Sequence, residues 1–389
     1  MLNVPAGDSF DLLIVAGEAS GDEHAARLLD DLRAKRPDLK VAALGGPKLE
    51  QAGAGLLLDL TEHAVVGVFE VLKNYGFFKA LFAEILAWIE KTCPQTVMFV
   101  DYPGFNLRLA EALRRRGVSR KGGGKVRLLQ YVSPQLWAWK PKRRFKMART
   151  LDALGVIFPF ETETYTDVDL PVRFVGHPFA REDYETTLSH DPEAPVLLLP
   201  GSRRQPVARI LPVLLDAFLL VSGEVSGLCA RVVSPSGEVR ASVEGLIACR
   251  PEAAGKVKVV GNDEHVSASA VLTSSGTMSL ACAMAGIPGA IAYRAHPLTY
   301  LLGKFLVKIP HLGMANLLLP DKPVYPEFIQ GDAKAAKLAQ CLRHCLDEPA
   351  EAVKAKEAAE CLRKLLSRPA DISAADWVLQ EGGLGEATN

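Results

Sequence analysis

The chain of 389 residues lacks the features that mark several protein classes. It has no excess charge, because 45 lysines and arginines balance 45 aspartates and glutamates, and this disfavours nucleic-acid binding driven by bulk charge. Its seven cysteines form no Cys-x-x-Cys pair or zinc motif, which indicates buried apolar residues of a reducing compartment. No apolar run approaches the roughly 20 residues that span a bilayer, and the amino terminus lacks a signal-peptide pattern. We therefore expect a cytoplasmic protein.

Several enzyme motifs are also missing. The chain contains no G-x-S-x-G nucleophile elbow, no H-E-x-x-H zinc motif and no set of kinase motifs. The G-x-G-x-x-G dinucleotide fingerprint is absent as well. Among the eight histidines, only His177 follows a predicted strand at a position with plausible access. These absences disfavour the corresponding hydrolase, protease, kinase and dinucleotide-binding activities.

Strand and helix signals alternate along most of the chain. With 49% hydrophobic and 23% charged residues, the composition is that of a well-buried globular protein. Repeated strand–turn–helix units predict parallel sheets that helices cover on both faces. The predicted strands are 11–18, 41–46, 96–101, 126–132, 153–158, 196–204, 230–235, 256–261, 268–277 and 289–295.

The alternation is interrupted at 186–195 and then begins again, which predicts two parallel α/β domains. We place the N-terminal domain at 1–185 and the C-terminal domain at 195–330. Residues 331–389 are expected to form a helical tail that packs back across the domains, because 332–366 are mostly Ala, Leu, Lys, Glu and Arg at helical spacing.

Loops that leave parallel strands carry the candidate chemistry, because ligands bind at the carboxyl ends of strands in open α/β sheets. In "AGEASGD", Gly17 permits a tight turn before a helix, and Glu18 places an acid at that turn. In "VDYPGFN", Asp101 ends a buried strand, where a half-desolvated carboxylate can act as a general base. Two structural alternatives stay open: Glu18 complements the helix dipole, and Asp101 caps the next helix or supports its turn.

Two loops of the second domain have the composition of phosphate sites. "LPGSRR" offers backbone and hydroxyl donors at Gly201 and Ser202, and a planar cation at Arg203. No Gly-Lys-Ser/Thr follows, so a diphosphate site is favoured over a nucleotide-hydrolysis site. "SSGT" leads directly into a helix and predicts another phosphate nest, although such residues also serve simply as helix caps. The residues of this second nest are Ser275, Gly276 and Thr277.

The segment "VSPQLWAWKPKRRFKMART" (132–150) concentrates aromatic and positive side chains and holds no acid. This composition favours a surface that meets a partner both apolar and anionic. The alternative is a solvated helix face beside two core tryptophans.

These motifs occur in the order that is typical of one family. The segments are "VAGEASGD", "VVGVFEVL", "VDYPGFNLRLA", "YVSPQLWAWKPKR", "FPFE", "FVGHP", "LLPGSR", "SSGT", "AYR" and "MANLLL…PEFIQ", from about residue 12 to 330. In this order they resemble the lipid-A-disaccharide synthases, and "SPQLWAW" is highly specific to that family. The resemblance implies the GT-B fold: two Rossmann-like parallel-sheet domains that face a cleft, here followed by a C-terminal helical tail.

The family moves 2,3-diacylglucosamine from its UDP donor to the 6-hydroxyl of 2,3-diacylglucosamine 1-phosphate, giving a β-1,6 disaccharide and UDP. The resemblance implies inversion by direct displacement, with no metal and no other cofactor. It implies that Asp101 removes the acceptor proton and that Glu18 positions or activates the acceptor, although either acid remains a candidate for the general base. Arg203 and the nest residues would hold the UDP diphosphate. Asn316 and Glu327 match cleft residues that bind one of the two substrates.

Because both substrates are acylated and anionic, the resemblance also implies peripheral binding to the inner membrane. The apolar stretch 71–91 is then a candidate for acyl-chain contact, and a buried core helix is its alternative. The residues expected at the membrane or the acyl chains are Trp137, Trp139, Lys140, Lys142, Arg143, Phe77 and Phe78.

Two positions depart from the family pattern. Ala281 stands where many GT-B enzymes carry a ribose-binding glutamate, and Pro206 stands where the family commonly has an acid. Rival interpretations are another GT-B enzyme, such as a UDP-sugar epimerase or a transferase with a different lipid acceptor, and a non-catalytic relative. The oligomeric state stays open, with a homodimer among the possibilities.

Overall fold

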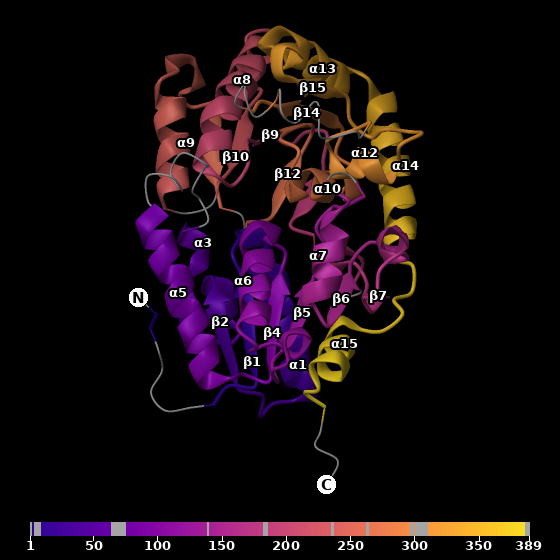
Figure 1. The fold of residues 1–389 in the computed structure, drawn as a ribbon. Coiled ribbons are helices and arrows are strands. Elements are labelled where there is room, and N and C mark those ends of the chain that lie inside the picture. The colour runs from indigo at the N-terminus through magenta and orange to yellow at the C-terminus, as the bar shows by residue number, and fades with distance from the viewer. Residues whose placement is uncertain are drawn as a thin grey trace. The chain divides into compact units, whose positions relative to one another are not determined.

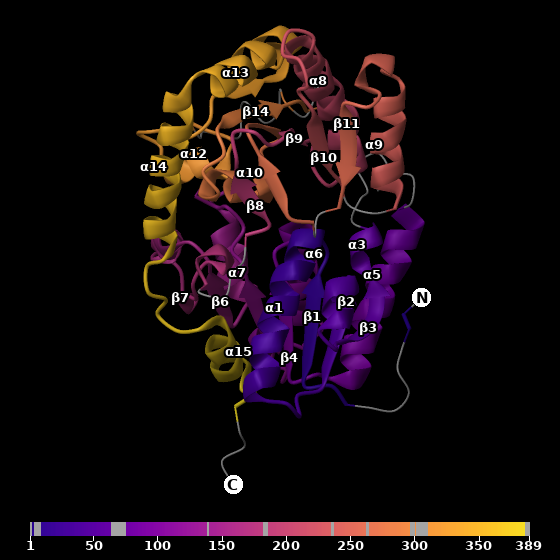
Figure 2. The same ribbon diagram turned by 180° about the vertical axis from the view of Figure 1, so that it is seen from behind.

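The computed structural model describes residues 2–3, 9–63, 75–137, 140–181, 186–234, 237–261, 264–295, 300 and 310–385. The chain divides into two compact units, each described here by itself. Unit 1 consists of Met1–Arg181 together with Leu366–Asn389, and unit 2 consists of Glu182–Leu365. Figures 1 and 2 show their elements from opposite sides.

Unit 1 is built on a seven-stranded sheet in the order β3-β2-β1-β4-β5-β6-β7, and every neighbouring pair is parallel. β1 and β4 are buried along their whole length, which explains their almost uninterrupted apolar sequences. The strands are β1 (Leu12–Ala16), β2 (Val41–Gly45), β3 (Gly55–Asp59), β4 (Thr96–Val100), β5 (Arg127–Tyr131), β6 (Ala153–Val156) and β7 (Val172–Phe174).

Helices cover both faces of this sheet. Figures 1 and 2 show α5, α6 and α7 over one face and α1 and α15 over the other. The α-helices are α1 (Ala19–Lys35), α2 (Pro47–Gln51), α3 (Leu60–His63), α5 (Tyr75–Thr92), α6 (Pro103–Arg115), α7 (Arg143–Thr150) and α15 (Ala374–Gly382). Short 3₁₀ helices are η1 (Arg120–Gly122), η2 (Pro159–Tyr165) and η3 (Pro178–Ala180). The core includes Phe99 of β4 and Ile85 and Trp88 of α5.

Unit 2 repeats this plan with a six-stranded parallel sheet in the order β11-β10-β9-β13-β14-β15, beside a two-stranded parallel sheet of β8 and β12. The six strands are β9 (Val196–Leu199), β10 (Ala230–Val233), β11 (Val257–Val260), β13 (Val271–Thr273), β14 (Gly289–Tyr293) and β15 (Glu327–Ile329). The two-stranded sheet pairs β8 (Leu188–His190) with β12 (Val266–Ala268).

The helices of unit 2 also pack in layers. α8 packs against α9 and α13, whereas α10 packs against α12. The α-helices are α8 (Arg204–Ser222), α9 (Glu238–Ala248), α10 (Thr277–Met284), α12 (Met314–Leu318), α13 (Ala335–Asp347) and α14 (Pro349–Leu366); η4 (Pro251–Ala253) and η5 (Gln330–Asp332) are 3₁₀ turns. Among the described residues, one helix, α8, has the length and apolar composition to cross a membrane, and 56% of its most apolar window is buried as in a core helix.

The ten strands predicted from the sequence are all present, and the prediction of parallel sheets covered by helices is confirmed. Five further strands were not predicted: β3, β7, β8, β12 and β15. Four of these have only three residues, which is too short for a periodic pattern to emerge.

The units also begin and end at different residues from those expected. The interrupted segment 186–195 contains β8, which pairs with β12, so the division falls earlier, after Arg181. Residues 331–389 are divided between the two units. α13 and α14 belong largely to unit 2, whereas α15 packs on α1, β5 and β6 of unit 1.

Candidate active site

The loops after β1 and β4 meet at the carboxyl edge of the unit 1 sheet. These strands are parallel neighbours whose last residues are in register, so Glu18 and Asp101 come to the same edge. Gly17 permits the close approach, because a Cβ at this position would overlap the ring of Tyr102. Both acids are half-buried, and the structure therefore brings together two of the residues expected to act on the acceptor.

Asp101 has an unusual backbone conformation. Its φ is 46° and that of Tyr102 is 47°, so two consecutive non-glycine residues occupy the left-handed region. Pro103 then begins α6, which places the carboxylate at the junction between strand and helix. Strain of this kind gathers at functional sites, which agrees with the role expected of Asp101.

A third acid, Glu161, lies buried near this edge and was not predicted as a site residue. Its carboxylate accepts hydrogen bonds from the backbone N–H of Phe158 at 3.1 Å and from the indole N–H of Trp137 at 3.3 Å. Burial raises the pKa of Glu161 from 4.5 to about 8; these hydrogen bonds oppose the rise, and the charge of Asp101 adds to it. The sequence signal was available: "FPFE" places an acid in the segment that follows the predicted strand 153–158.

The indole of Trp137 is anchored to the protein as well as being partly exposed. Besides its bond to Glu161, it packs edge-on against Phe160, with ring centroids 5.2 Å apart. Trp139 and the side chain of Phe77 lie outside the described residues, and Phe78 is half-buried.

His177 is buried rather than accessible. Its Nδ1 accepts a hydrogen bond from the backbone N–H of Phe179 at 3.1 Å, and its ring lies 4.9 Å from that of Phe158. Burial lowers the pKa of His177 to about 3, and nearby His24 contributes to the shift. Burial also lowers the pKa of His24 to about 4. Both imidazoles are therefore neutral packing groups near pH 7, and His177 is too weak a base for proton transfer there.

In unit 2, the two predicted phosphate loops are neighbours. β9 and β13 pair in parallel, and the backbone N–H of Ser274 donates to the carbonyl of Leu199 at 2.8 Å. Gly201 has a φ of 111°, and a Cβ there would lie 3.4 Å from Oγ of Ser274. The sheet thus sets "LPGSRR" and "SSGT" side by side.

A helix begins after each of these loops, and no N-cap side chain hydrogen-bonds to the backbone N–H groups of its first turn. Arg203 is the N-cap of α8 and Gly276 is the N-cap of α10, and neither helix has a side-chain cap. The amides of a helix N-terminus carry partial positive charge and attract anions. The surrounding loop residues are exposed, namely Ser202, Arg203, Gly276 and Thr277. Two adjacent helix N-termini with an arginine suit a diphosphate.

Asn316 and Glu327 are arranged differently from expectation. Asn316 is fully buried, and its amide nitrogen donates to the carbonyl of Tyr325 at 2.7 Å and to Glu327 at 2.8 Å. Glu327 also accepts from the backbone N–H groups of Leu312 and Gly313 at 2.8 and 2.9 Å. These side chains join the turn before α12 to β15 by hydrogen bonds, and their contact with a substrate stays a prediction.

The two positions that were expected to depart from the family pattern both lie beside the unit 2 loops. Ala281 is buried within α10, and Pro206 lies in the first turn of α8, in contact range of a Cβ placed at Gly201. Neither position carries a side chain that can hydrogen-bond a ribose.

The predicted cationic surface lies at and before α7. Lys140 and Lys142 are exposed and Arg143 is half-buried. Phe145 on the same helix is 45% exposed and was not predicted, because its apolar side chain stands alone among cations. By contrast, α5 turns Ile85 and Trp88 into the core, so this part of the apolar stretch 71–91 has a structural role.

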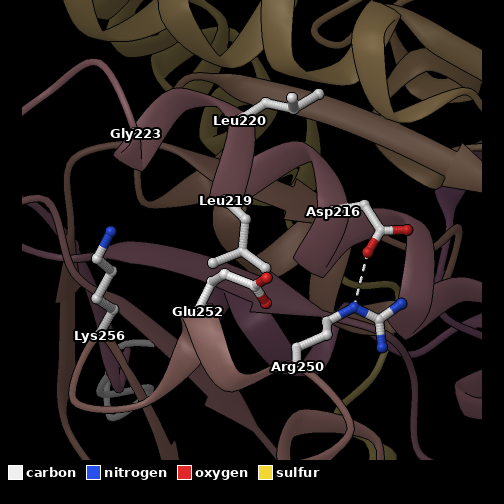
Figure 3. A pocket seen from close by; sticks show the side chains of 7 residues that line it. All are labelled: Asp216, Leu219, Leu220, Gly223, Arg250, Glu252 and Lys256. Carbon is white, nitrogen blue, oxygen red and sulfur yellow. Dashed lines mark hydrogen bonds and ion pairs between the residues drawn. The ribbon is translucent and has the colours of Figure 1, made fainter.

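An open pocket of about 520 Å³ lies elsewhere in unit 2 (Figure 3). It is lined by the last turns of α8 and by Arg250, Glu252 and Lys256, and an ion pair of 2.7 Å joins Arg250 to Asp216. Asp216 is twelve residues along α8 from Arg204, or roughly 18 Å at the rise of an α-helix. The pocket is thus separate from the phosphate loops.

Comparisons with known proteins agree with this arrangement. A family model described as lipid-A-disaccharide synthetase matches residues 12–380. The lipid-A-disaccharide synthase of Geobacter metallireducens is 35% identical over 356 residues, which cover 88% of this chain and 89% of that protein.

Solved structures show the fold alone, because their sequence identity is low. A putative UDP-N-acetylglucosamine 2-epimerase from Listeria monocytogenes aligns with a TM-score of 0.61 and 11% identity over 98% of both chains. The glycotransferase of kitacinnamycin aligns with a TM-score of 0.59 and 14% identity over 96% of this chain and 100% of that one. The expected GT-B class, with two Rossmann-like parallel sheets, is therefore confirmed. By the extent of the family match and the identity to its curated members, the chain belongs to the lipid-A-disaccharide synthetase family.

Proposed function

We propose that this enzyme transfers 2,3-diacylglucosamine from its UDP donor to the 6-hydroxyl of 2,3-diacylglucosamine 1-phosphate. The products are the β-1,6-linked disaccharide 1-phosphate and UDP. The observation that carries the proposal is the pair of adjacent, uncapped helix N-termini beside Arg203, in a chain whose family is named for this product.

In unit 2, the diphosphate of the donor binds at these N-termini. The amides at the start of α8 and α10 and the guanidinium of Arg203 stabilise the negative charge that grows on the leaving UDP. Ser202, Ser275 and Thr277 supply hydroxyl donors to the same group. Fixed donors of this kind cost no reorganisation during the reaction.

In unit 1, Asp101 accepts the proton of the acceptor 6-hydroxyl while the hydroxyl oxygen attacks the anomeric carbon. The new O6–C1 bond forms as the bond from C1 to the diphosphate oxygen breaks, and the configuration at C1 inverts. Glu18 lies at the same sheet edge and orients the acceptor. Asn316 and Glu327 support the donor side indirectly, by holding the turn before α12.

The test is a reaction in detergent micelles that contain both acylated substrates, with UDP and disaccharide quantified separately. Wild-type protein should form the two products in equal amounts, and Asp101→Ala should lose turnover while keeping its fold by circular dichroism. UDP release without disaccharide would favour an epimerase or hydrolase. No reaction at any acyl length tested would remove the proposal in favour of a non-catalytic relative.

We also propose that the α7 surface contacts the inner membrane, where the acylated substrates reside. Lys140, Lys142 and Arg143 face anionic headgroups, and Phe145 enters the interface. Phe145→Ser should weaken co-sedimentation with vesicles of mixed neutral and anionic phospholipid, whereas Val353→Ser, on an exposed apolar residue of α14, should leave it unchanged. Equal sedimentation of the three proteins would contradict this surface. A homodimer stays a prediction for measurement by light scattering.

A further inference from the structure

Gln130, the fourth residue of β5, has its side chain fully buried next to the turn that carries Asp101. Its amide nitrogen lies 3.2 Å from the carbonyl oxygen of Asp101 and 3.1 Å from that of Val132. It is also 3.4 Å from the carbonyl oxygen of Tyr131. This same oxygen accepts a hydrogen bond from the backbone N–H of Asp101 at 3.1 Å. One side chain therefore joins the ends of two neighbouring strands.

Asn106, in the first turn of α6, approaches the same carbonyl from the other side. Its amide nitrogen lies 2.8 Å from the carbonyl oxygen of Asp101 and 3.4 Å from that of Val100. The Asp101 carbonyl thus receives N–H donors from two buried primary amides, Asn106 and Gln130. Two donors at one oxygen fix the plane of the peptide that joins Asp101 to Tyr102.

The backbone at this point needs such support. Asp101 and Tyr102 both have positive φ angles, and Val132, next to the Gln130 clamp, has a φ of 66° despite its branched Cβ. Side chains disfavour this region, so such residues persist only where the surroundings over-determine them. The Cα–Cβ bond of Asp101 projects from a backbone whose N and carbonyl C are held in place, so amides that fix its carbonyl also restrict where its carboxylate can point.

The oxygen atoms of these two side-chain amides indicate that their N–H groups are the functional part. Within the described part of the chain, Oε1 of Gln130 and Oδ1 of Asn106 are buried without a hydrogen-bond partner. A buried polar atom without a partner destabilises the fold, and an apolar side chain of the same shape would avoid that cost. Both residues are therefore poor choices for stability alone and good choices for holding the Asp101 carbonyl.

We propose that Gln130 is a positioning residue for catalysis, acting with Asn106 through the backbone of Asp101 to aim its carboxylate at the acceptor hydroxyl. This inference rests on the proposed function, in which Asp101 is the base. Gln130 itself contacts only the protein. Its loss should change the chemical step more than substrate binding, because misplacement by about 1 Å can cost on the order of 100-fold in rate.

The kinetic test compares Gln130→Met, which keeps the shape and removes the donor, with Thr96→Val. Thr96 is a matched control: it is fully buried at the other end of β4, and its hydroxyl donates to the carbonyl of Gly382 at 2.7 Å. Gln130→Met should lower kcat by roughly 10- to 100-fold and change KM of both substrates by less than about threefold. Thr96→Val should lose thermal stability at unchanged kcat.

A double variant separates positioning from a general effect on the fold. In the Asp101→Ala background, Gln130→Met should cause no further loss of residual turnover, because the group that it positions is gone. Unchanged kcat in Gln130→Met, or an equal loss in the Asp101→Ala background, would overturn the inference. If Gln130→Met does not fold, Asn106→Leu removes the second donor to the same carbonyl and should give the same split between kcat and KM.

A crystal structure of Gln130→Met tests the inference without relying on activity. The Asp101–Tyr102 peptide should rotate, and at least one of the two φ angles should leave the left-handed region. An unchanged backbone in the variant contradicts the clamp even in active protein. Absence of disaccharide from the wild type, with a rotated backbone in the variant, instead removes the proposed function and leaves the clamp in place.

Discussion

The two units present their candidate groups in opposite ways. At the carboxyl edge of the unit 1 sheet, Asp101 sits on a strained turn that buried side-chain amides hold from two directions. At the corresponding edge of the unit 2 sheet, Arg203 and Gly276 are exposed, and helix N-termini supply the donors. Proton transfer requires one carboxylate in one direction, whereas a flexible diphosphate can adapt to several amides. Under the proposed function, the comparison separates a fixed catalytic group from an open binding surface.

The largest effect that would test this comparison is the loss of the base in unit 1. Asp101→Asn keeps the size of the side chain and removes its basicity, so kcat should fall by about 10²- to 10⁴-fold. The acid limb of the pH–rate profile should disappear with it, whereas Glu18→Gln should keep that limb at a lower rate. Asp59→Asn is the control, because Asp59 also ends a strand of this sheet and accepts hydrogen bonds from Thr61. If the acid limb disappears in Glu18→Gln and persists in Asp101→Asn, Glu18 is the base.

The next effect concerns the open surface in unit 2. Arg203→Ala should raise KM for the UDP donor by about 10- to 100-fold, the range of a hydrogen bond between charged groups, and should change kcat less. Arg204→Ala offers a neighbouring control, because Arg204 is exposed and faces Glu238 at 3.7 Å. Inhibition by UDP, measured for both variants, gives the same comparison without the acceptor. Equal losses in the two variants would mean that nonspecific positive charge, and not the position of Arg203, attracts the donor.

The same contrast explains what the sequence predicted and what it did not. Glycine and hydroxyl residues between a strand and a helix are a local pattern typical of a phosphate nest, so Gly201 and the "SSGT" loop could be predicted as phosphate sites from adjacent residues. The partners of Asp101 come from another strand and from the next helix. Gln130 reads in sequence as a polar residue in an apolar strand, and only the pairing of β4 with β5 shows which carbonyls it reaches.

The sequence also could not predict the hydrogen-bond partners of individual side chains. Asn316 and Glu327 were predicted as substrate contacts, which stays a prediction, and the sequence did not show that their polar atoms pair with each other and with the chain around α12. Ten of the strands, the two parallel sheets and the location of the acids at strand ends followed from patterns along the chain. The direction of each side chain did not, because packing against non-neighbouring residues decides it.

A smaller effect on stability should arise in unit 1 from Glu161. The pKa of Glu161 is about 8 in the folded state and near 4.5 in the unfolded state. Between pH 4.5 and pH 8, the folded state therefore holds a proton that the unfolded state does not. Its stabilising contribution is therefore complete below about pH 4.5 and is lost as the pH rises through 8. His24 and His177, with lowered folded pKa values, act in the opposite sense but only below about pH 6.5.

The window from pH 6.5 to 8 thus isolates Glu161. One proton corresponds to at most about 1.4 kcal/mol per pH unit, so unfolding free energy should fall by up to about 2 kcal/mol across the window. Glu161→Gln should flatten this slope in urea titrations followed by tryptophan fluorescence. Glu163→Gln, on the same 3₁₀ helix, should leave the slope as it is in the wild type. A slope that persists in Glu161→Gln would assign it to another group.

The smallest predicted effect sharpens the account of strain in the Asp101 turn. Val132 adopts a φ of 66°, donates its N–H to Gly155 at 3.0 Å and accepts from Gln130, so its backbone bonds do not depend on its side chain. Glycine reaches this conformation without steric cost, so Val132→Gly should relieve about 1 kcal/mol of strain and lose a similar amount in packing and chain entropy. The melting temperature should stay within about 2 °C of the wild type.

Val172→Gly is the control, at another half-buried valine, in β7. This position has no strain to relieve, so the substitution should clearly lower the melting temperature. Equal destabilisation by the two substitutions would mean that Val132 stores no strain, and the strain beside the clamp would then be confined to Asp101 and Tyr102.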